Sequence, residues 1–110
     1  MVEHVVRSSE GETVLLVCSG SVDAFNLEDF YGAGHLVSHF TRSDLGYELS
    51  DAALAARILH DGSEALDCLS RSRVGRMMLA RGLRHEVAYA ARKDHLSVVP
   101  ELRGGRLVAA

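Results

Sequence analysis

Two adjacent carboxylates, Glu28 and Asp29, are the residues whose types and position best suit metal binding and catalysis. They follow an apolar segment, residues 13–18, and a loop of small residues, and they fall in the first turn of an expected helix. The carboxyl end of a strand is where α/β enzymes bind ligands, and carboxylate oxygens suit Mg²⁺. Adjacent helical side chains diverge by about 100°, so one carboxylate would bind the ion and the other would support it. Alternatively, Asp29 caps the helix, whose dipole favours negative charge there, and Glu28 is solvated.

Two histidines, His35 and His39, share one face of the same expected helix with Glu28. A histidine pair four residues apart can chelate zinc. Glu28 lies seven residues before His35, about 10 Å along a helix axis, which is too far for a three-ligand site on one straight helix. The alternative is a polar stripe opposite the apolar face of the helix.

Cys18 ends the apolar segment, where a cysteine phosphatase would need a thiolate followed by an arginine about six residues later. Position 24 is alanine and the loop holds no Arg or Lys, so Cys18 is predicted to be a small core residue. The loop is no P-loop, because no Gly-Lys-Ser/Thr follows, but backbone amides such as that of Gly20 could contact an anion. Four later arginines suit phosphate or sulfonate contacts, or else form a solvated helix face: Arg71, Arg73, Arg76 and Arg81.

The elements that would position the carboxylates are a strand and a helix. Residues 13–18 form a continuous apolar run, which predicts a strand buried on both faces, as in a parallel sheet covered by helices. Asn26 is the expected N-cap of a helix over residues 27–42, with Asp29 as a short relative of the capping box. An amphipathic fragment at residues 2–6, followed by a polar break at 7–12, precedes the strand.

Further helices are predicted over residues 51–60, capped by Ser50 and ended by Asp61 and Gly62, and over residues 63–81, either continuous or broken near 70–72. The expected buried side of the helix over residues 51–60 is made of Ala52, Ala55, Ile58 and Leu59.

The end of the chain mixes ambiguous and extended segments. Residues 86–92 fit a short helix or a strand, and Pro100 predicts extended chain before it. A turn at 103–106 leads to a possible last strand at 107–108. The pattern is α/β with too few strands, because a buried strand needs neighbours on both edges. A partner chain or a missing half is therefore expected.

Composition narrows the function classes. At 110 residues the chain fits one domain or part of one. Twelve basic and fifteen acidic residues leave a net charge of −3, too balanced to indicate nucleic acid or an anionic membrane. No apolar run approaches the roughly 20 residues of a membrane span, and a secretory signal is not apparent. We therefore expect a cytoplasmic protein whose two cysteines are free thiols.

The ordered set of short motifs resembles the C-terminal half of the 2-phosphosulfolactate phosphatase family, from about residue 3 to residue 108. The motifs that carry the resemblance are Cys18-Ser19-Gly20, Leu27-Glu28-Asp29, Ala33-Gly34, Leu49-Ser50-Asp51-Ala52-Ala53, Ser72-Arg73-Val74-Gly75-Arg76, Gly82, Glu86-Val87-Ala88-Tyr89, Asp94 and Val99-Pro100.

The resemblance implies a fold and an activity. The fold class would be α/β, a partial three-layer α/β/α sandwich, with residues 1–110 as one incomplete domain. The activity would be Mg²⁺-dependent hydrolysis of 2-phosphosulfolactate, or a similar small phosphorylated acid, in a step toward coenzyme M. Glu28 and Asp29 would be the catalytic and metal residues, and Gly20 and Arg76 would bind the substrate. A homo-oligomer is possible, and neither nucleic acid nor membrane is an expected partner.

The sequence also departs from the family pattern. The family's N-terminal half, with its Asp-Arg and Asn-Gly-Thr motifs, has no counterpart here, and His85 stands where an acidic residue is frequent. His35 and His39 are not part of the resemblance. Two alternatives stay open: a catalytically inactive truncated relative that acts as a binding or assembly module, and a transition-metal protein that uses His35 and His39.

Overall fold

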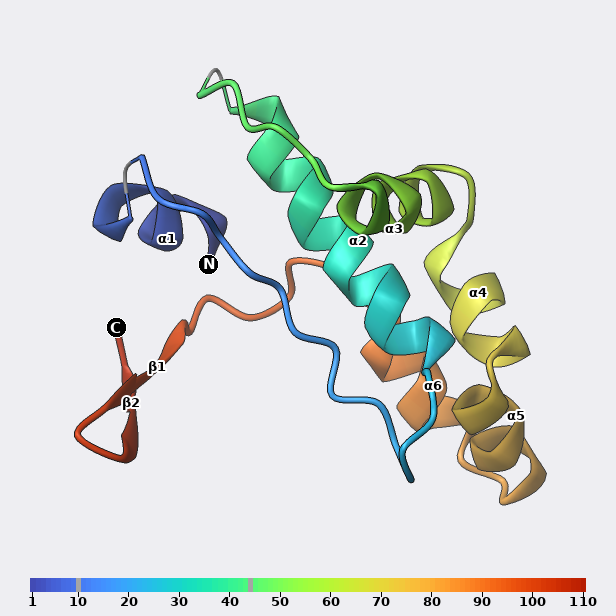
Figure 1. Ribbon diagram of the computed structural model, residues 1–110. Coiled ribbons are helices and arrows are strands. Elements are labelled where there is room, and N and C mark those ends of the chain that lie inside the picture. The colour runs from blue at the N-terminus through green and yellow to red at the C-terminus, as the bar shows by residue number, and fades with distance from the viewer. Residues whose placement is uncertain (10, 44) are drawn as a thin grey trace. The chain divides into compact units, whose positions relative to one another are not determined.

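The computed structural model describes residues 1–9, 11–43 and 45–110. Within them the chain forms six helices and one two-stranded sheet (Figure 1). It divides into two compact units, a helical unit, Leu15–Arg92, and a terminal unit made of Met1–Val14 and Lys93–Ala110. No helix in the described part of the chain is long and apolar enough to cross a membrane.

The terminal unit contains helix α1, Val2–Ser8, and a hairpin of strands β1, Pro100–Arg103, and β2, Arg106–Ala109. The strands pair antiparallel through a two-residue turn in which both glycines have positive φ, +56° and +77°. Such a turn matches the twist of the strands. The early helix, the turn and the last strand are as predicted. The predicted polar break at 7–12 includes Glu10, which lies outside the described residues.

The helical unit is built on α2, Leu27–Arg42, which packs against α3, Asp51–Asp61. The two helices approach so closely at Gly34 that a Cβ there would overlap the carbonyl oxygen of Ala56. The Ser50 hydroxyl accepts the amide of Ala53 at 3.2 Å and caps α3, as predicted.

The predicted buried face of α3 is wrong except at Leu59, which is half-buried and packs against the core. The buried residues are Ala56 and His60, whereas Ile58 is exposed. Close contact with Gly34 needs a small side chain at the helix crossing, and Ala56, which was not in the predicted set, occupies that position. The other three members of the expected set, Ala52, Ala55 and Leu59, are exposed or half-buried.

Three short helices complete the unit: α4, Ala65–Arg71, α5, Arg73–Ala80, and α6, Arg84–Ala90. Ser72 separates α4 from α5 and caps α5, because its buried hydroxyl accepts the amide of Gly75 at 2.9 Å. The predicted break is thus confirmed, and residues 86–92, ambiguous in sequence, are largely helical. The core joins α2 to α4 through Tyr31, Ala65 and Cys68.

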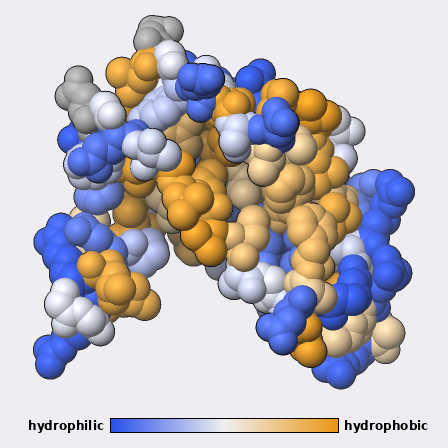
Figure 2. Space-filling model, in the orientation of Figure 1, coloured by the Kyte–Doolittle hydropathy of each residue, from blue (hydrophilic) through white to orange (hydrophobic). Residues whose placement is uncertain are grey.

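Residues 13–18 do not form the predicted buried strand. The segment is extended, no strand in the described part of the chain pairs with it, and Leu15 and Val17 are each 80% exposed. An apolar run becomes a strand only where a neighbour accepts its backbone hydrogen bonds, and the described residues supply none. Other large apolar side chains are exposed too, and Figure 2 shows apolar surface over much of the visible face.

Candidate functional site

The loop before α2 closes into a tight turn. Ser21 and Ala24 exchange backbone hydrogen bonds of 3.2 and 3.1 Å, and the two residues between them have positive φ. Gly20 has a φ of +65°, and a Cβ there would lie 2.6 Å from the carbonyl oxygen of Ala24. Only glycine fits this position without strain. The tight turn therefore depends on glycine at position 20.

Asp29 binds this loop instead of capping its own helix. Its carboxylate accepts the Gly20 amide at 2.8 Å. Asn26 is the N-cap residue but makes no side-chain cap, since its Oδ1 accepts hydrogen bonds from Ser21 Oγ at 3.0 Å and from Arg73. The predicted capping box is wrong, because both side chains are used to hold the loop against the helix.

Arg73, the first residue of α5, joins α5 to the loop. Its Nη2 donates to Ser21 Oγ at 2.6 Å, to the Ser21 carbonyl at 3.3 Å and to Asn26 Oδ1 at 2.8 Å. All three acceptors are neutral, and no carboxylate in the described part of the chain pairs with this guanidinium. The charge remains available to an anion.

Arg76, the arginine singled out from the sequence, is exposed and donates to the backbone carbonyl of Arg71. The arginine at the loop is Arg73, which sequence reasoning included among four candidates without choosing it. Its position directly after Ser72, the residue predicted to break the helix, is the signal that could have identified it. Arg73 lies in the first turn of α5 and reaches Asn26 at the start of α2, because the chain changes direction at the break at Ser72.

Glu28 is half-buried, and neither of its carboxylate oxygens reaches solvent or has a hydrogen-bond partner among the described residues. Its charge lies near the buried thiol of Cys68 on α4. Burial raises the pKa of that thiol, and the charges of Asp67 and Glu28 add to the rise. A carboxylate shielded from water without a partner is costly, so it points to a missing ligand.

The two carboxylates therefore diverge, as their adjacent positions require. Glu28 lies near α4, while Asp29 contacts the loop. The alternative raised from the sequence fails in both of its parts, because Asp29 is not the helix cap and the Glu28 carboxylate is not solvated.

Cys18 is exposed, so its predicted place in the core is wrong; the expectation of free thiols is confirmed for Cys18 and Cys68. Desolvation and the charge of Asp29 raise the pKa of the Cys18 thiol. A raised pKa leaves little thiolate at neutral pH, which is the opposite of what a nucleophilic cysteine needs.

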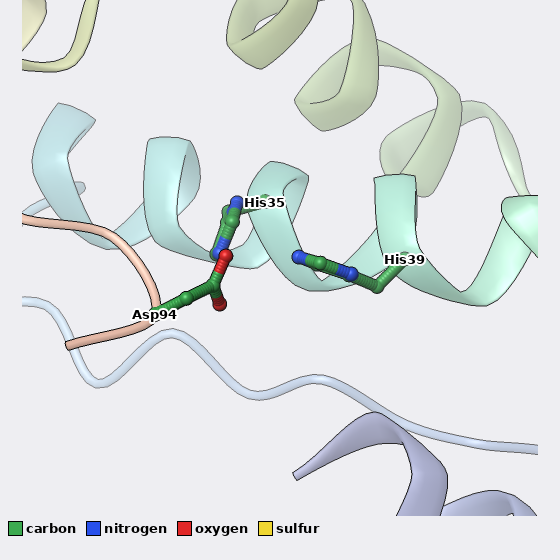
Figure 3. A group of neighbouring side chains, drawn as sticks. All are labelled: His35, His39 and Asp94. Atoms are coloured by element: carbon green, nitrogen blue, oxygen red, sulfur yellow. The ribbon is translucent and has the colours of Figure 1, made fainter. Parts of the chain in front are cut away.

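The histidines of α2 form a second group. His35 and His39 project to the same side of the helix, with their rings edge to face and centroids 4.6 Å apart (Figure 3). His35 Nδ1 lies 3.2 Å from Nε2 of the buried His60 on α3. His60 Nδ1 in turn lies 2.9 Å from Asp61 Oδ1. Asp94, also labelled in Figure 3, belongs to the terminal unit.

The sequence did not identify His60 as a member of this group, because its partner His35 lies on another helix. The hydrogen bond from His60 is the largest of the effects that lower the pKa of Asp61, and one from Arg57 adds to it. Asp61 is therefore a carboxylate at neutral pH.

Comparison with known proteins identifies the family. The sequence profile of the 2-phosphosulpholactate phosphatase family matches residues 1–105. The chain belongs to this family, as the sequence resemblance predicted.

Curated relatives of this chain bear the name of the same family. The chain is 38% identical over 97 residues to a probable 2-phosphosulfolactate phosphatase of Carboxydothermus hydrogenoformans, covering 86% of this chain and 40% of the relative. A protein of the same name from Gloeobacter violaceus is 37% identical over 101 residues, covering 90% and 41%. The one from Thermotoga maritima is 31% identical over 96 residues, covering 86% and 40%. The chain thus spans about 40% of the length of these relatives. No solved structure gives a significant match.

Proposed function

We propose that this chain carries part of the active site of a Mg²⁺-dependent phosphatase. The substrate would be 2-phosphosulfolactate or a similar small phosphorylated acid, hydrolysed to sulfolactate and phosphate. The observation that carries the proposal is the Glu28 carboxylate, which is shielded from water and has no partner among the described residues. Family membership supports the reaction class. The proposal also keeps the fold predicted from the sequence, one incomplete domain contributing to a three-layer α/β/α sandwich.

The residues at the start of α2 fit a hard divalent cation. Two carboxylates on neighbouring positions offer oxygen ligands, and Mg²⁺ keeps several waters when few protein groups bind it. Glu28 would bind the ion directly, because its oxygens are unused. Asp29 would support the site by holding the Gly20 amide, and it has a second oxygen for the ion. When bound, Mg²⁺ would neutralise phosphate charge and orient an attacking water.

The loop and Arg73 would hold the anionic substrate. A molecule with phosphate, sulfonate and carboxylate groups needs positive charge and N–H donors. Arg73 supplies a guanidinium whose contacts are all neutral oxygens, and it fixes Ser21 and Asn26 in place. Gly20 would shape this substrate loop, because its amide donates to Asp29 and the Ala24 carbonyl fills the place of a side chain. Arg76 stays in the proposal as a second contact, because its exposed side chain donates to a backbone carbonyl and not to the loop.

Phosphate release from 2-phosphosulfolactate by the purified chain, with Mg²⁺ and again with a chelator, tests the proposal. Release that the chelator abolishes, and that Glu28→Gln abolishes without loss of folding, is the expected result for a site contained in this chain. Absence of release from a chain that unfolds cooperatively would show that residues outside it are needed. The same pair of assays on a protein of the relatives' full length then decides the role of Glu28.

A further inference from the structure

We propose that a cavity between helices α4, α5 and α6 binds a small zwitterion with an aliphatic side chain, an α-amino acid of the size of leucine. None of the residues proposed to bind the metal ion or the phosphorylated substrate lines this cavity. The amino-acid site is therefore independent of the proposed phosphatase chemistry, and it would remain if the chain hydrolysed no phosphate ester.

The cavity has the size and the lining of a small-molecule site. Its volume is about 420 Å³, near the lower end of the range of about 300–1,000 Å³ that ligand pockets occupy. The three helices contact one another (Figure 1), and each contributes one large apolar side chain to the lining: Leu66 of α4, Leu79 of α5 and Val87 of α6. Val87 is buried and Leu79 is half-buried. These side chains favour an aliphatic group, because its burial removes apolar surface from water.

Arg84, the first residue of α6, supplies the positive charge of the lining. Its guanidinium has neither a hydrogen bond nor an ion pair with any residue in the described part of the chain. A guanidinium is always charged and carries five N–H donors in a planar fork. An arginine with unused donors beside an apolar cavity fits a carboxylate, which it can bind through two parallel hydrogen bonds.

Two carboxylates, Glu64 and Asp67, belong to the same lining. Asp67 is already paired, since its Oδ2 lies 3.3 Å from Arg71 Nη1. Glu64 accepts the amide of Asp67 with its Oε2 at 3.1 Å and caps α4, which leaves its Oε1 unused by the described residues. Glu64 and Arg84 do not pair with each other, so the cavity keeps one unpaired charge of each sign.

This pair of charges selects the class of ligand. An α-amino acid presents its ammonium group to Glu64, its carboxylate to Arg84 and its aliphatic side chain to the apolar lining. An aliphatic amine would suit Glu64 but would bring a like charge toward Arg84, and an aliphatic carboxylate would do the reverse. The zwitterion complements both charges without repulsion.

Titration of the isotopically labelled chain with leucine, followed by nuclear magnetic resonance, tests the site because it both detects and locates weak binding. We expect saturable shifts of amide resonances in α4 and α6, with a Kd of about 1 mM, as suits a small ligand in an open site. Isocaproate is leucine without its ammonium group, and isoamylamine is leucine without its carboxylate. Each should bind about 10-fold more weakly than leucine, because each leaves one charge unpaired. Glycine, which has no side chain to bury, should bind about 10- to 100-fold more weakly.

Two substitutions assign the charges. Arg84→Ala should weaken leucine binding about 10-fold and abolish the preference for leucine over isoamylamine. Glu64→Gln should abolish the preference for leucine over isocaproate, and it keeps an oxygen for the amide of Asp67. Arg81→Ala and Asp51→Asn are matched controls that should keep the wild-type affinity, because both side chains are exposed and neither lines the cavity. Circular dichroism melts establish that each variant folds, with Arg84→Gln as the replacement where Arg84→Ala does not.

Absence of a saturable response in the wild-type chain would overturn the proposal. Binding of isocaproate or isoamylamine as tight as that of leucine would also overturn it, because one of the two charges would then have no role. Unchanged affinity in folded variants of both Arg84 and Glu64 would contradict the assignment to this cavity. Shifts centred on the loop before α2, instead of on α4 and α6, would place amino-acid binding at the proposed phosphatase site and would equally contradict it.

Discussion

At the scale of single residues, the main finding is a conflict between stability and proposed function at Glu28. Its carboxylate is shielded from solvent and has no partner among the described residues. Such a group lowers stability, because the charge loses its hydration without receiving a hydrogen bond or counter-ion. Conflicts of this kind are expected where a side chain serves ligand binding and not the stability of the fold.

Glu28→Met should stabilise the metal-free chain. The substitution keeps most of the side-chain volume and removes the buried charge, so we expect the free energy of unfolding to rise by about 1 kcal/mol. Urea denaturation with a chelator present measures it. Glu3→Met, at an exposed glutamate of α1, is the matched control and should change stability by less than about 0.5 kcal/mol. Destabilisation by Glu28→Met would show that the carboxylate has a stabilising partner.

Arg73 and Arg76 lie on the same helix, so the effects of their alanine substitutions on stability can be compared directly. Arg73→Ala removes hydrogen bonds to Ser21 and Asn26 and leaves their oxygens to water, so we expect a loss of about 1–2 kcal/mol. Arg76→Ala should cost less than about 0.5 kcal/mol, because this side chain is exposed and contacts only a backbone carbonyl. Chemical denaturation compares the two. A larger effect at Arg76 would contradict the assignment of Arg73 to the loop.

Asp61 should give stability a component that is lost in acid. Its pKa is lowered in the folded chain, chiefly by the hydrogen bond from His60, so the folded state favours the carboxylate. The contribution is therefore present above the ordinary carboxyl pKa of about 3.9 and is lost as pH falls through the lower folded value. The difference in stability between wild type and Asp61→Ala should shrink from about pH 5 toward about pH 2.5. A difference that grows in that range would reverse the assigned sign.

At the scale of elements, the packing of α2 on α3 depends on the absence of a side chain at one position. Gly34 lies against the backbone of α3, where a Cβ would overlap the Ala56 carbonyl oxygen. Backbone cannot move aside as a flexible side chain can, so the helices would have to separate. The same crossing brings His60 to His35, and the histidine group therefore depends on it.

Gly34→Ala should destabilise the chain by about 3 kcal/mol through this overlap. Gly32→Ala is the matched control on the same helix, because nothing lies within 4 Å of its Cβ position. Alanine has the higher helix propensity, so this control should be neutral or stabilising by about 0.5–1 kcal/mol. Urea midpoints give both values. Similar effects at the two glycines would show that the helices are not in close contact.

At the scale of the whole molecule, the main departure from the predicted fold is the extended segment at residues 13–18. It has the composition of a buried strand, but Leu15 and Val17 are each 80% exposed. The double substitution Leu15→Lys and Val17→Lys should therefore change the stability of this chain by less than about 1 kcal/mol. A buried strand would lose several kcal/mol from two charged substitutions. Unfolding midpoints separate the two cases, and a large loss would show that the segment is covered in solution.

The sequence by itself determined the local features. The extent of α2 follows from periodicity, the start of α3 and the break at Ser72 follow from serine caps, and the last turn follows from Gly104 and Gly105. All of these act between residues close in the chain. Family membership was also visible in the order of short motifs.

The tertiary structure alone decided which residues meet. It placed Arg73 rather than Arg76 on the loop, joined His60 to His35, and buried Ala56 rather than Ile58. It also left residues 13–18 without a strand partner. Each of these outcomes depends on contacts between elements far apart in sequence, where close approach, available partners and burial select among candidates that local patterns cannot distinguish.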